Sequence, residues 1–235
     1  MKVKSSATSP VRPAQLVEHH VITGILDGTY PPGRLLPNER QLAEIIGVAR
    51  PPLRETLHRL ANEGWLTIAH GKPTQVNDYW EKGSMGVLST LVKYIDTLPA
   101  GFVIHLMEVR SRLLPIIAGL AVAQAPDEVH TYLEAAGQID DDVSAFVDFD
   151  WRLHLFLATQ SRNPIYKLIL NDLSTMFKTL AAAYFSIPAA RAASRQYYRD
   201  LSTAVQAGSR RVETVVMDAM MQSISLWESI RVIRS

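Results

Sequence analysis

The sequence predicts a mainly α-helical protein that contains a small N-terminal domain with a β-hairpin and a C-terminal antiparallel helical bundle. Three amphipathic helical segments lie within residues 13–62, and two short runs typical of strands follow within residues 65–78. Beyond residue 86 the apolar spacing is helical throughout. The chain has 235 residues, of which 47% are hydrophobic and 20% charged, so it can bury the cores of two domains.

Two helices are predicted at the start of the first domain. Apolar residues recur at helical spacing from Pro13 to Leu26, and a proline pair soon afterwards ends the pattern. Asn38 is a favourable N-cap for a second helix, and Gln41 at its third position completes a capping box. Gly47 ends this helix, because glycine readily adopts the left-handed conformation found after a helix.

A third helix and a hairpin complete the first domain. The helix is predicted to run from about Pro51 to Asn62, since proline lacks an N–H and is tolerated in a first helical turn. Residues 65–70 and 73–78 are then predicted to form two strands around Gly71-Lys72. Three helices followed by a hairpin are the order of a winged helix-turn-helix, and we assign residues 1–80 to this domain.

The remainder of the chain is predicted to be helical. Residues 81–100 are assigned to a linker and connecting helix, and residues 101–235 to a helical effector-binding domain. Breaks at TLPAG, APDE, SRNP, SIPAA and AGSRR divide this part into six or seven helices. The longest apolar stretch, residues 113–125, is shorter than a membrane span, so we expect a buried core helix and no membrane partner.

Composition and motif searches exclude several function classes. The chain contains no cysteine, which excludes disulfides and cysteine-based metal sites and fits a reducing cytoplasm. Its first 15 residues lack the apolar segment of a signal peptide, so we expect a cytoplasmic protein. No glycine-rich phosphate loop, nucleophile elbow or metal cluster is found, and we therefore expect no catalytic residues and no enzyme activity.

Basic residues are placed where this fold meets double-stranded DNA. Arg50 and Arg54 lie four residues apart at the start of the third helix, where arginine can bind guanine bidentately or grip a phosphate. Arg40 lies in the first turn of the second helix, near the path of a DNA backbone strand. His70 and Lys72 form a basic tip on the hairpin that can reach a minor groove or a phosphate.

The segment YPPGRLLPNERQLAEIIGVARPPLRETLHRLANEGWLTIAHGKPTQVND resembles the DNA-binding domain of the GntR superfamily of transcriptional regulators. The similarity to its FadR subfamily continues through SRNPIYKLILN and SISLWE and covers almost the whole chain. The resemblance implies a homodimer that binds a palindromic operator through Arg40, Arg50, Arg54 and His70. Family members often carry threonines at three neighbouring positions, which are here Ala49, Pro51 and Pro52.

The resemblance also implies control of fatty acid metabolism, with long-chain acyl-CoA as the effector that releases the operator and with no cofactor. Such a ligand needs an apolar channel and cationic or hydrogen-bonding groups. Arg110 is a candidate, as are Ser223 and Trp227, which share a helix face. The resemblance adds Tyr184 and Tyr198 as residues that line the channel, although a packed aromatic core explains these tyrosines equally well.

A metal-dependent sensor of a small carboxylate is the alternative. Asp150 and His154 lie four residues apart on one predicted helix face and suit two ligands of one ion. Many GntR regulators hold a divalent ion with an aspartate and three histidines. None of the seven histidines of this chain follows residue 154, and the expected positions align with Arg199 and Met221. Two ligands rarely make a stable site, so we predict no metal.

Overall fold

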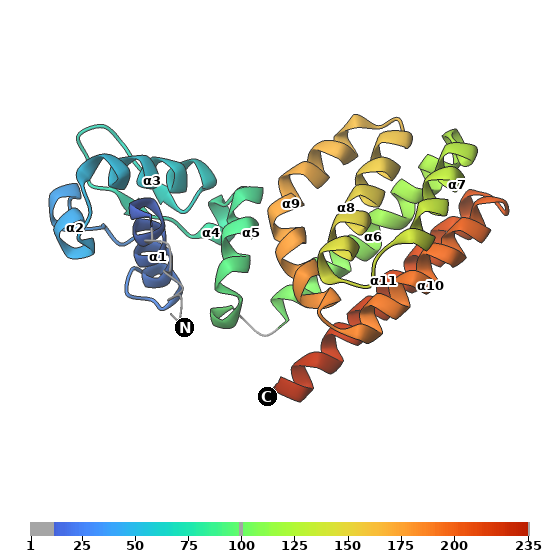
Figure 1. The fold of residues 1–235 in the computed structure, drawn as a ribbon. Helices are drawn as coiled ribbons and strands as arrows, with labels where there is room; N and C mark the ends of the chain where they lie inside the picture. Colours follow the sequence, from blue (N-terminus) through green and yellow to red (C-terminus); the bar gives the residue numbers. More distant parts are fainter. Residues whose placement is uncertain (1–11, 99–100, 235) are drawn as a thin grey trace, which may run out of the picture. The chain divides into compact units, whose positions relative to one another are not determined.

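The computed structural model describes residues 12–98 and 101–234, and the chain divides between Leu98 and Pro99 into two compact units (Figure 1). The first unit contains three helices, a hairpin and the short helices α4 (Tyr79–Lys82), α5 (Met85–Leu91) and η1 (Val92–Thr97). The segment assigned to a linker and connecting helix therefore lies, up to residue 98, in the first unit.

The three predicted helices of the first unit are present as α1 (Pro13–Leu26), α2 (Glu39–Ile46) and α3 (Arg50–Glu63). The capping box of α2 is confirmed. The Gln41 backbone N–H donates to Asn38 Oδ1 at 3.0 Å, and the Asn38 N–H donates to Gln41 Oε1 at 3.3 Å. These bonds satisfy two backbone donors that the helix start would otherwise leave free.

The hairpin is shorter than predicted. Strand β1 (Leu66–Thr67) pairs antiparallel with β2 (Gln75–Val76), and Leu66 lies opposite Val76. The chain between them turns early, because the Lys72 N–H donates to the Ala69 carbonyl at 3.1 Å. The outer halves of both predicted strands consequently form a loop rather than a ladder, and this loop is the wing.

Buried apolar residues of all three helices and both strands, with Trp65 just before β1, form the core of the first unit. They are Val17, Val21, Ile22, Leu42, Leu53, Leu57, Leu60, Trp65, Leu66 and Val76. Gly64 lets the chain turn from α3 into β1 where it passes close to the backbone at the end of α4. Its φ of 99° is left-handed, and a Cβ there would collide with the Lys82 backbone carbonyl.

An ion-pair network joins α1, α3 and η1 within the first unit. Glu18 contacts Arg59 at 2.5 Å and Lys93 at 2.7 Å, and Arg59 also contacts Glu63 at 2.6 Å. Thr90 Oγ1 donates to Glu63 Oε2 at 3.1 Å. Burial pushes the pKa of Glu18 upwards, but the hydrogen bond and charge of Lys93 and the charge of Arg59 outweigh it and lower this pKa.

Residues 101–234, the described part of the second unit, form a bundle of six α-helices and one short 3₁₀ helix, as predicted (Figure 1). Prolines occupy the first turns of three of the α-helices, where their missing N–H costs nothing. The elements are α6 (Phe102–Gln124), α7 (Pro126–Glu134), η2 (Ala135–Gln138), α8 (Val143–Gln160), α9 (Pro164–Phe185), α10 (Pro188–Val205) and α11 (Ser209–Arg234).

Helices α6 and α11 run antiparallel. Gly119, in the second half of α6, lies against the side chain of Glu213 in the first turns of α11, and Arg110, earlier in α6, bonds to Ser223, later in α11. The prediction that residues 113–125 are buried is only partly correct, because Ile116 and Leu120 are exposed. Among the described residues, none of the helices has the length and apolarity needed to cross a membrane.

Candidate nucleic-acid interface and effector site

The predicted DNA-reading arginines are exposed on α2 and α3. Arg40 Nε lies 3.4 Å from Glu44, and Arg54 Nε lies 3.2 Å from Glu39, with the two arginine side chains 75% and 62% exposed. Ion pairs at such exposure contribute little to stability. Both guanidinium groups can therefore exchange their carboxylates for phosphate or base acceptors at small cost.

The start of α3 offers an unusual set of donors. Arg50 is exposed at the first helical position, and Ala49 precedes it as an N-cap without a side-chain hydrogen bond. Pro51 and Pro52 have no N–H, and the Leu53 N–H already donates to the Ala49 carbonyl at 3.4 Å. This helix start consequently has few backbone N–H groups for phosphate, and its contacts must come mainly from the arginines.

The wing tip carries the two predicted basic residues. His70 and Lys72 are both exposed, on either side of Gly71, whose φ is 69°. A left-handed residue at this point lets the loop reverse sharply, which glycine does without strain. The structure therefore places a histidine and a lysine at the outer end of the loop between β1 and β2.

The interior of the second unit contains a cluster of polar residues from four helices. Arg110 of α6 donates to Ser223 Oγ of α11 at 2.8 Å. Tyr198 of α10 donates its hydroxyl proton to Asp150 Oδ1 of α8 at 2.9 Å, and His154 Nδ1 lies 3.7 Å from Asp150 Oδ2. Residues far apart in sequence thus form one buried polar cluster.

Burial determines the protonation states in this cluster. It lowers the pKa of His154 below its ordinary value, with Asp150 opposing and Arg110 assisting, so the imidazole is neutral at pH 7. Burial likewise raises the pKa of Tyr184 to about 12 and that of Tyr198 well above its ordinary value. The phenols are therefore hydrogen-bond donors rather than anions.

Three buried polar atoms in or beside the cluster have no hydrogen-bond partner within the described chain: Arg110 Nε, His154 Nε2 and Tyr197 Oη. Each such atom costs about 1–3 kcal/mol unless another polar group satisfies it. The charge of Arg110 affects the pKa values of both His154 and Tyr197, which places these residues in one electrostatic neighbourhood. The cluster can therefore accept additional polar groups.

The structure brings only some of the predicted effector residues together. Arg110 and Ser223 are in contact, and Tyr198 is buried against Asp150. Tyr184 on α9 is partly buried, and Trp227 lies one helical turn beyond Ser223 and is also partly buried. Sequence reasoning missed Tyr197, although helical periodicity along α10 could have identified it as an inward-facing residue.

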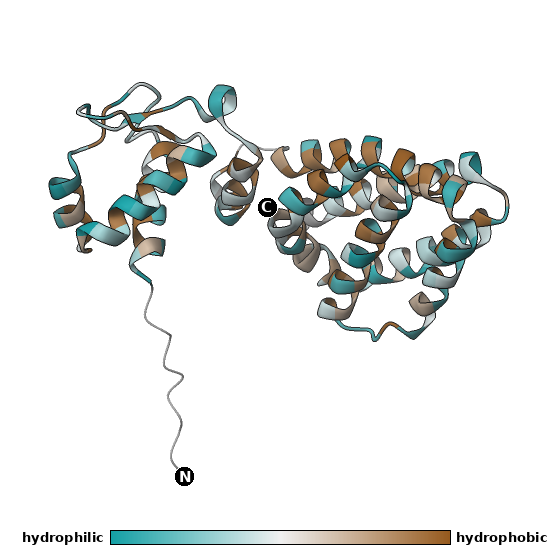
Figure 2. Cartoon of the chain, turned by 90° about the horizontal axis from the view of Figure 1, so that it is seen from above, coloured by the Kyte–Doolittle hydropathy of each residue, from teal (hydrophilic) through white to brown (hydrophobic). Residues whose placement is uncertain are grey.

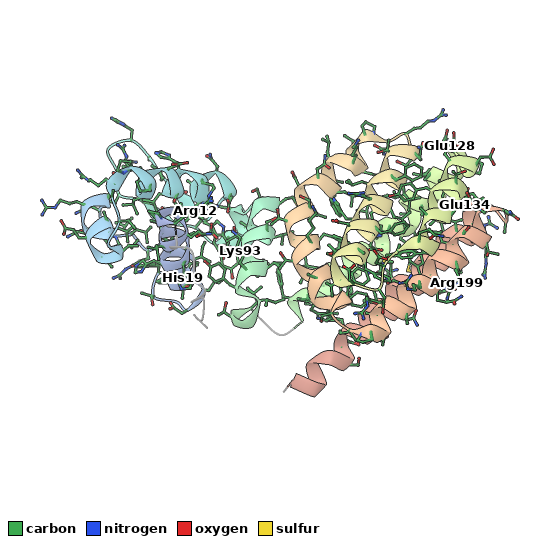
Figure 3. All side chains as sticks on the ribbon, in the orientation of Figure 1. Arg12, His19, Lys93, Glu128, Glu134 and Arg199 are labelled. Carbon is green, nitrogen blue, oxygen red and sulfur yellow. The ribbon has the colours of Figure 1, made fainter. Side chains whose placement is uncertain are left out.

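Arg199 and Met221, which occupy the two expected metal-ligand positions, do not face Asp150. Both side chains are exposed, and Arg199 instead bonds to Gln196 Oε1 at 2.6 Å on the surface of α10 (Figure 3). The residue that faces Asp150 from α10 is Tyr198. Arg199 lies one position further along α10, about 100° around the helix, and so points to the surface.

The donor set does not fit a metal ion. The described residues contain no group of three histidine, cysteine, aspartate or glutamate side chains that could hold one. Asp150 and His154 are adjacent, but their third neighbour is a protonated phenol that donates to the same carboxylate. Even an open catalytic zinc site has three protein ligands, so this pair alone falls short.

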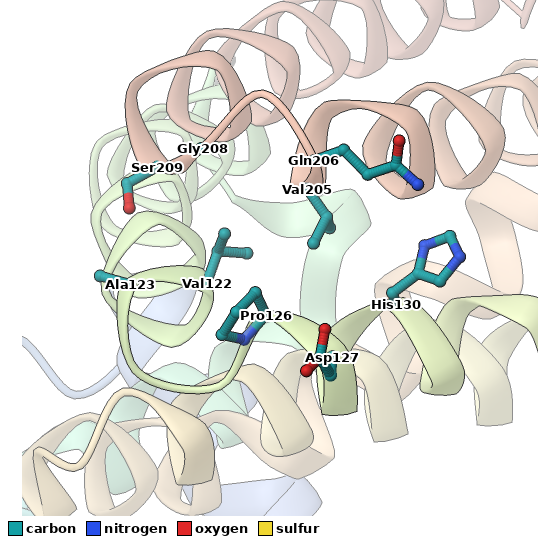
Figure 4. A pocket seen from close by; sticks show the side chains of 9 residues that line it. All are labelled: Val122, Ala123, Pro126, Asp127, His130, Val205, Gln206, Gly208 and Ser209. Atoms are coloured by element: carbon teal, nitrogen blue, oxygen red, sulfur yellow. The ribbon is translucent and has the colours of Figure 1, made fainter.

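A separate pocket of about 440 Å³ lies at the end of the bundle where α6 joins α7 and α10 joins α11 (Figure 4). Pro126, Asp127, His130 and Gln206 are among its lining residues. None of the residues predicted for the effector lines it. Its mixture of small apolar and polar groups does not provide the long apolar channel that an acyl chain needs.

Comparisons with known proteins agree with this architecture. Residues 13–76 match the family model for bacterial regulatory proteins of the gntR family, and residues 77–233 match the FadR C-terminal domain. The fatty acid metabolism regulator protein of Klebsiella pneumoniae (strain 342) is 39% identical over 196 residues, which cover 83% of this chain and 82% of that protein.

The corresponding protein of Salmonella newport (strain SL254) is also 39% identical, over 84% of this chain and 82% of its own. A solved structure of Lar, described as controlling expression of the Listeria monocytogenes agr system, has a TM-score of 0.54 and 17% identity. It covers 96% of this chain and 100% of its own, and it supports the fold alone.

Proposed function

The chain belongs to the GntR family of transcriptional regulators, with the fatty acid metabolism regulators among its relatives, and we propose that it is an acyl-CoA-responsive operator-binding protein. A homodimer binds a palindromic operator, and long-chain acyl-CoA bound within the second unit releases it. The protein thereby controls genes of fatty acid metabolism in the cytoplasm.

The DNA half of the proposal is supported by the exposed basic groups of the first unit. Arg50 and Arg54 enter the major groove from the start of α3, and Arg40 binds the flanking phosphate backbone. His70 and Lys72 on the wing contact the adjacent minor groove or phosphates. Because the start of α3 has few free backbone N–H groups, the two arginines are the main source of its DNA contacts.

The effector half is supported by the buried polar cluster, and above all by the unsatisfied Arg110 Nε beside Ser223. A guanidinium with a free donor inside an apolar bundle suits a ligand that combines phosphate or carbonyl oxygens with a long apolar tail. Tyr184 and Tyr198 supply neutral donors, and Trp227 can stack on an adenine ring.

Operator release by acyl-CoA is the direct test. The purified protein first selects its operator from random DNA, and fluorescence anisotropy then measures operator affinity with oleoyl-CoA or with free CoA. We expect oleoyl-CoA to weaken binding by about tenfold or more and CoA to have far less effect, because the tail must fill the bundle. Unchanged affinity with oleoyl-CoA would refute the effector proposal.

Variants locate the site. Arg110→Met should bind operator normally and lose the response to oleoyl-CoA, whereas Arg152→Met, at an exposed position on α8, should respond like the wild type. Trp227→Ala, one helical turn beyond Ser223 on α11, provides a second variant on a different helix. Full responses in both Arg110→Met and Trp227→Ala would place the effector elsewhere.

A further inference from the structure

Two buried polar atoms of the second unit have no part in the proposed CoA contacts. They are His154 Nε2 on α8 and the Tyr197 hydroxyl oxygen on α10, and neither has a hydrogen-bond partner within the described residues. His154 and Tyr197 are only 2% and 6% exposed. Because buried polar groups are almost always hydrogen-bonded, two open ones in the same cluster indicate a ligand that supplies the missing partners.

The surroundings of these two atoms are largely apolar. The His154 ring packs edge-on against Phe177 with ring centroids 5.6 Å apart, and the Tyr197 ring centroid lies 5.4 Å from that of Tyr198. Brown, hydrophobic segments recur along the helices of the second unit in Figure 2. A polar atom in such an interior has no contact with bulk water, so its partner must be a molecule bound inside the bundle.

The two atoms need opposite kinds of hydrogen-bond partner. His154 is neutral, and its Nδ1 lies 3.7 Å from Asp150 Oδ2. A carboxylate oxygen on this side favours the tautomer with the proton on Nδ1, so Nε2 is an acceptor that lacks a donor. Burial raises the pKa of Tyr197, so its hydroxyl keeps the proton and lacks an acceptor. One group that both donates and accepts would satisfy the two atoms together.

A hydroxyl on the acyl chain fits this requirement better than the other parts of an acyl-CoA. The thioester carbonyl only accepts, and a saturated chain beyond it has no polar atom for His154 Nε2. The pantetheine amides can donate, but the proposed function assigns CoA to Arg110 and the Ser223–Trp227 face of α11. His154 and Tyr197 lie on two other helices and are more deeply buried than Arg110 and Trp227, so the acyl chain reaches them.

The position of the hydroxyl follows from Arg110, whose charge acts on both His154 and Tyr197 and therefore lies near them. We propose that the effector is a long-chain acyl-CoA with a hydroxyl a few carbons from the thioester, as in a 3-hydroxyacyl-CoA. This hydroxyl donates to His154 Nε2 and accepts from the Tyr197 hydroxyl. The inference rests on the proposed function and narrows its ligand, since chains without the hydroxyl bind the same site more weakly.

Calorimetry with two ligands that differ by one oxygen atom tests the hydroxyl directly. 3-Hydroxyhexadecanoyl-CoA and hexadecanoyl-CoA are titrated separately into the full chain. We expect the hydroxylated ligand to bind at least about tenfold more tightly, because it satisfies two buried groups that the saturated ligand leaves open. Both ligands should release the selected operator in fluorescence anisotropy, and the hydroxylated one should do so at a correspondingly lower concentration.

Variants assign the preference to the two atoms. Tyr197→Phe removes only the hydroxyl, and His154→Leu removes the ring nitrogens at a similar side-chain volume. Each should weaken binding of the hydroxylated ligand by about five- to tenfold and change hexadecanoyl-CoA binding by less than about twofold. Most of the preference is then lost. Tyr166→Phe, at a partly exposed position near the start of α9, is the matched control and should keep the preference.

The outcomes separate this inference from the proposed function. Equal dissociation constants of the two ligands for the wild type would overturn the hydroxyl contact and leave the acyl-CoA proposal intact. Variants that keep the preference, or that weaken both ligands equally, would do the same, because the two atoms would then serve bound water or the CoA part. Binding of neither ligand to the wild type would overturn the acyl-CoA effector itself.

Discussion

The two units use polar side chains in opposite ways. In the first unit the functional arginines are exposed and bound only by weak surface ion pairs, whereas in the second unit Arg110, Asp150 and His154 are drawn into a bundle interior. An exposed charge can bind any acceptor that diffuses to it. A buried polar group favours only a ligand that replaces its lost hydration, so selectivity resides in the second unit.

The largest effect is expected from removing a carboxylate of the buried polar cluster. Asp150→Ala leaves the Tyr198 hydroxyl without its acceptor and removes the carboxylate beside His154 Nδ1, so we expect a loss of about 3 kcal/mol in the free energy of unfolding. Urea denaturation measures it. Asp148→Ala, at an exposed position on the same helix, should change stability by less than about 0.5 kcal/mol. Equal losses of unfolding free energy in the two variants would mean that the buried cluster contributes no more to stability than an exposed carboxylate.

Substitution of the exposed arginines of α3 should instead weaken operator binding. Arg50→Ala and Arg54→Ala should each cost about 1–3 kcal/mol of operator affinity, with little change in stability, because each removes a base contact from an exposed position. Arg210→Ala, exposed on α11, is the control. If both α3 variants bind the selected operator like the wild type, α3 is not the reading helix.

The buried His154 should make the stability of the second unit depend on pH. Because its folded pKa is depressed, the unfolded chain binds more protons as pH falls below about 6.5, and folding stability decreases there. The wild type should therefore lose up to about 1.4 kcal/mol per pH unit relative to His154→Gln in urea denaturation between pH 7 and 5. His105→Gln, at an exposed position, should follow the wild type. Parallel profiles for His154→Gln and the wild type would contradict a buried neutral imidazole.

The smallest expected effect concerns the wing. Lys72→Ala should lower the slope of log affinity against log salt by about 0.9 without altering the selected sequence, because one phosphate contact is lost. Competition between operator variants over a salt series measures both quantities, with Lys178→Ala as the control. A changed base preference would show that the wing reads bases rather than phosphates.

The sequence predicted those features that depend on local rules. The capping box at Asn38, the proline start of α3 and the left-handed Gly47 are decided within a few residues, and each is present. The hairpin strands were overestimated, because β propensity does not report where a loop closes its own hydrogen bonds.

Long-range features were harder to predict. The Arg110–Ser223 and Asp150–Tyr198 contacts join residues separated by 113 and 48 positions, so no local pattern reveals them. Tyr198 is buried and Arg199 exposed although they are consecutive, because one position on a helix turns a side chain by about 100°. The outward face of α6 was missed for a related reason, because an apolar run alone does not show which side is covered.

Coupling between the units is the central claim, and calorimetry tests it most directly. Oleoyl-CoA is titrated into the full chain, free and saturated with its selected operator. Linkage requires operator to weaken oleoyl-CoA binding by the same factor by which oleoyl-CoA weakens operator binding, about tenfold or more. Identical oleoyl-CoA dissociation constants with and without operator would contradict the account.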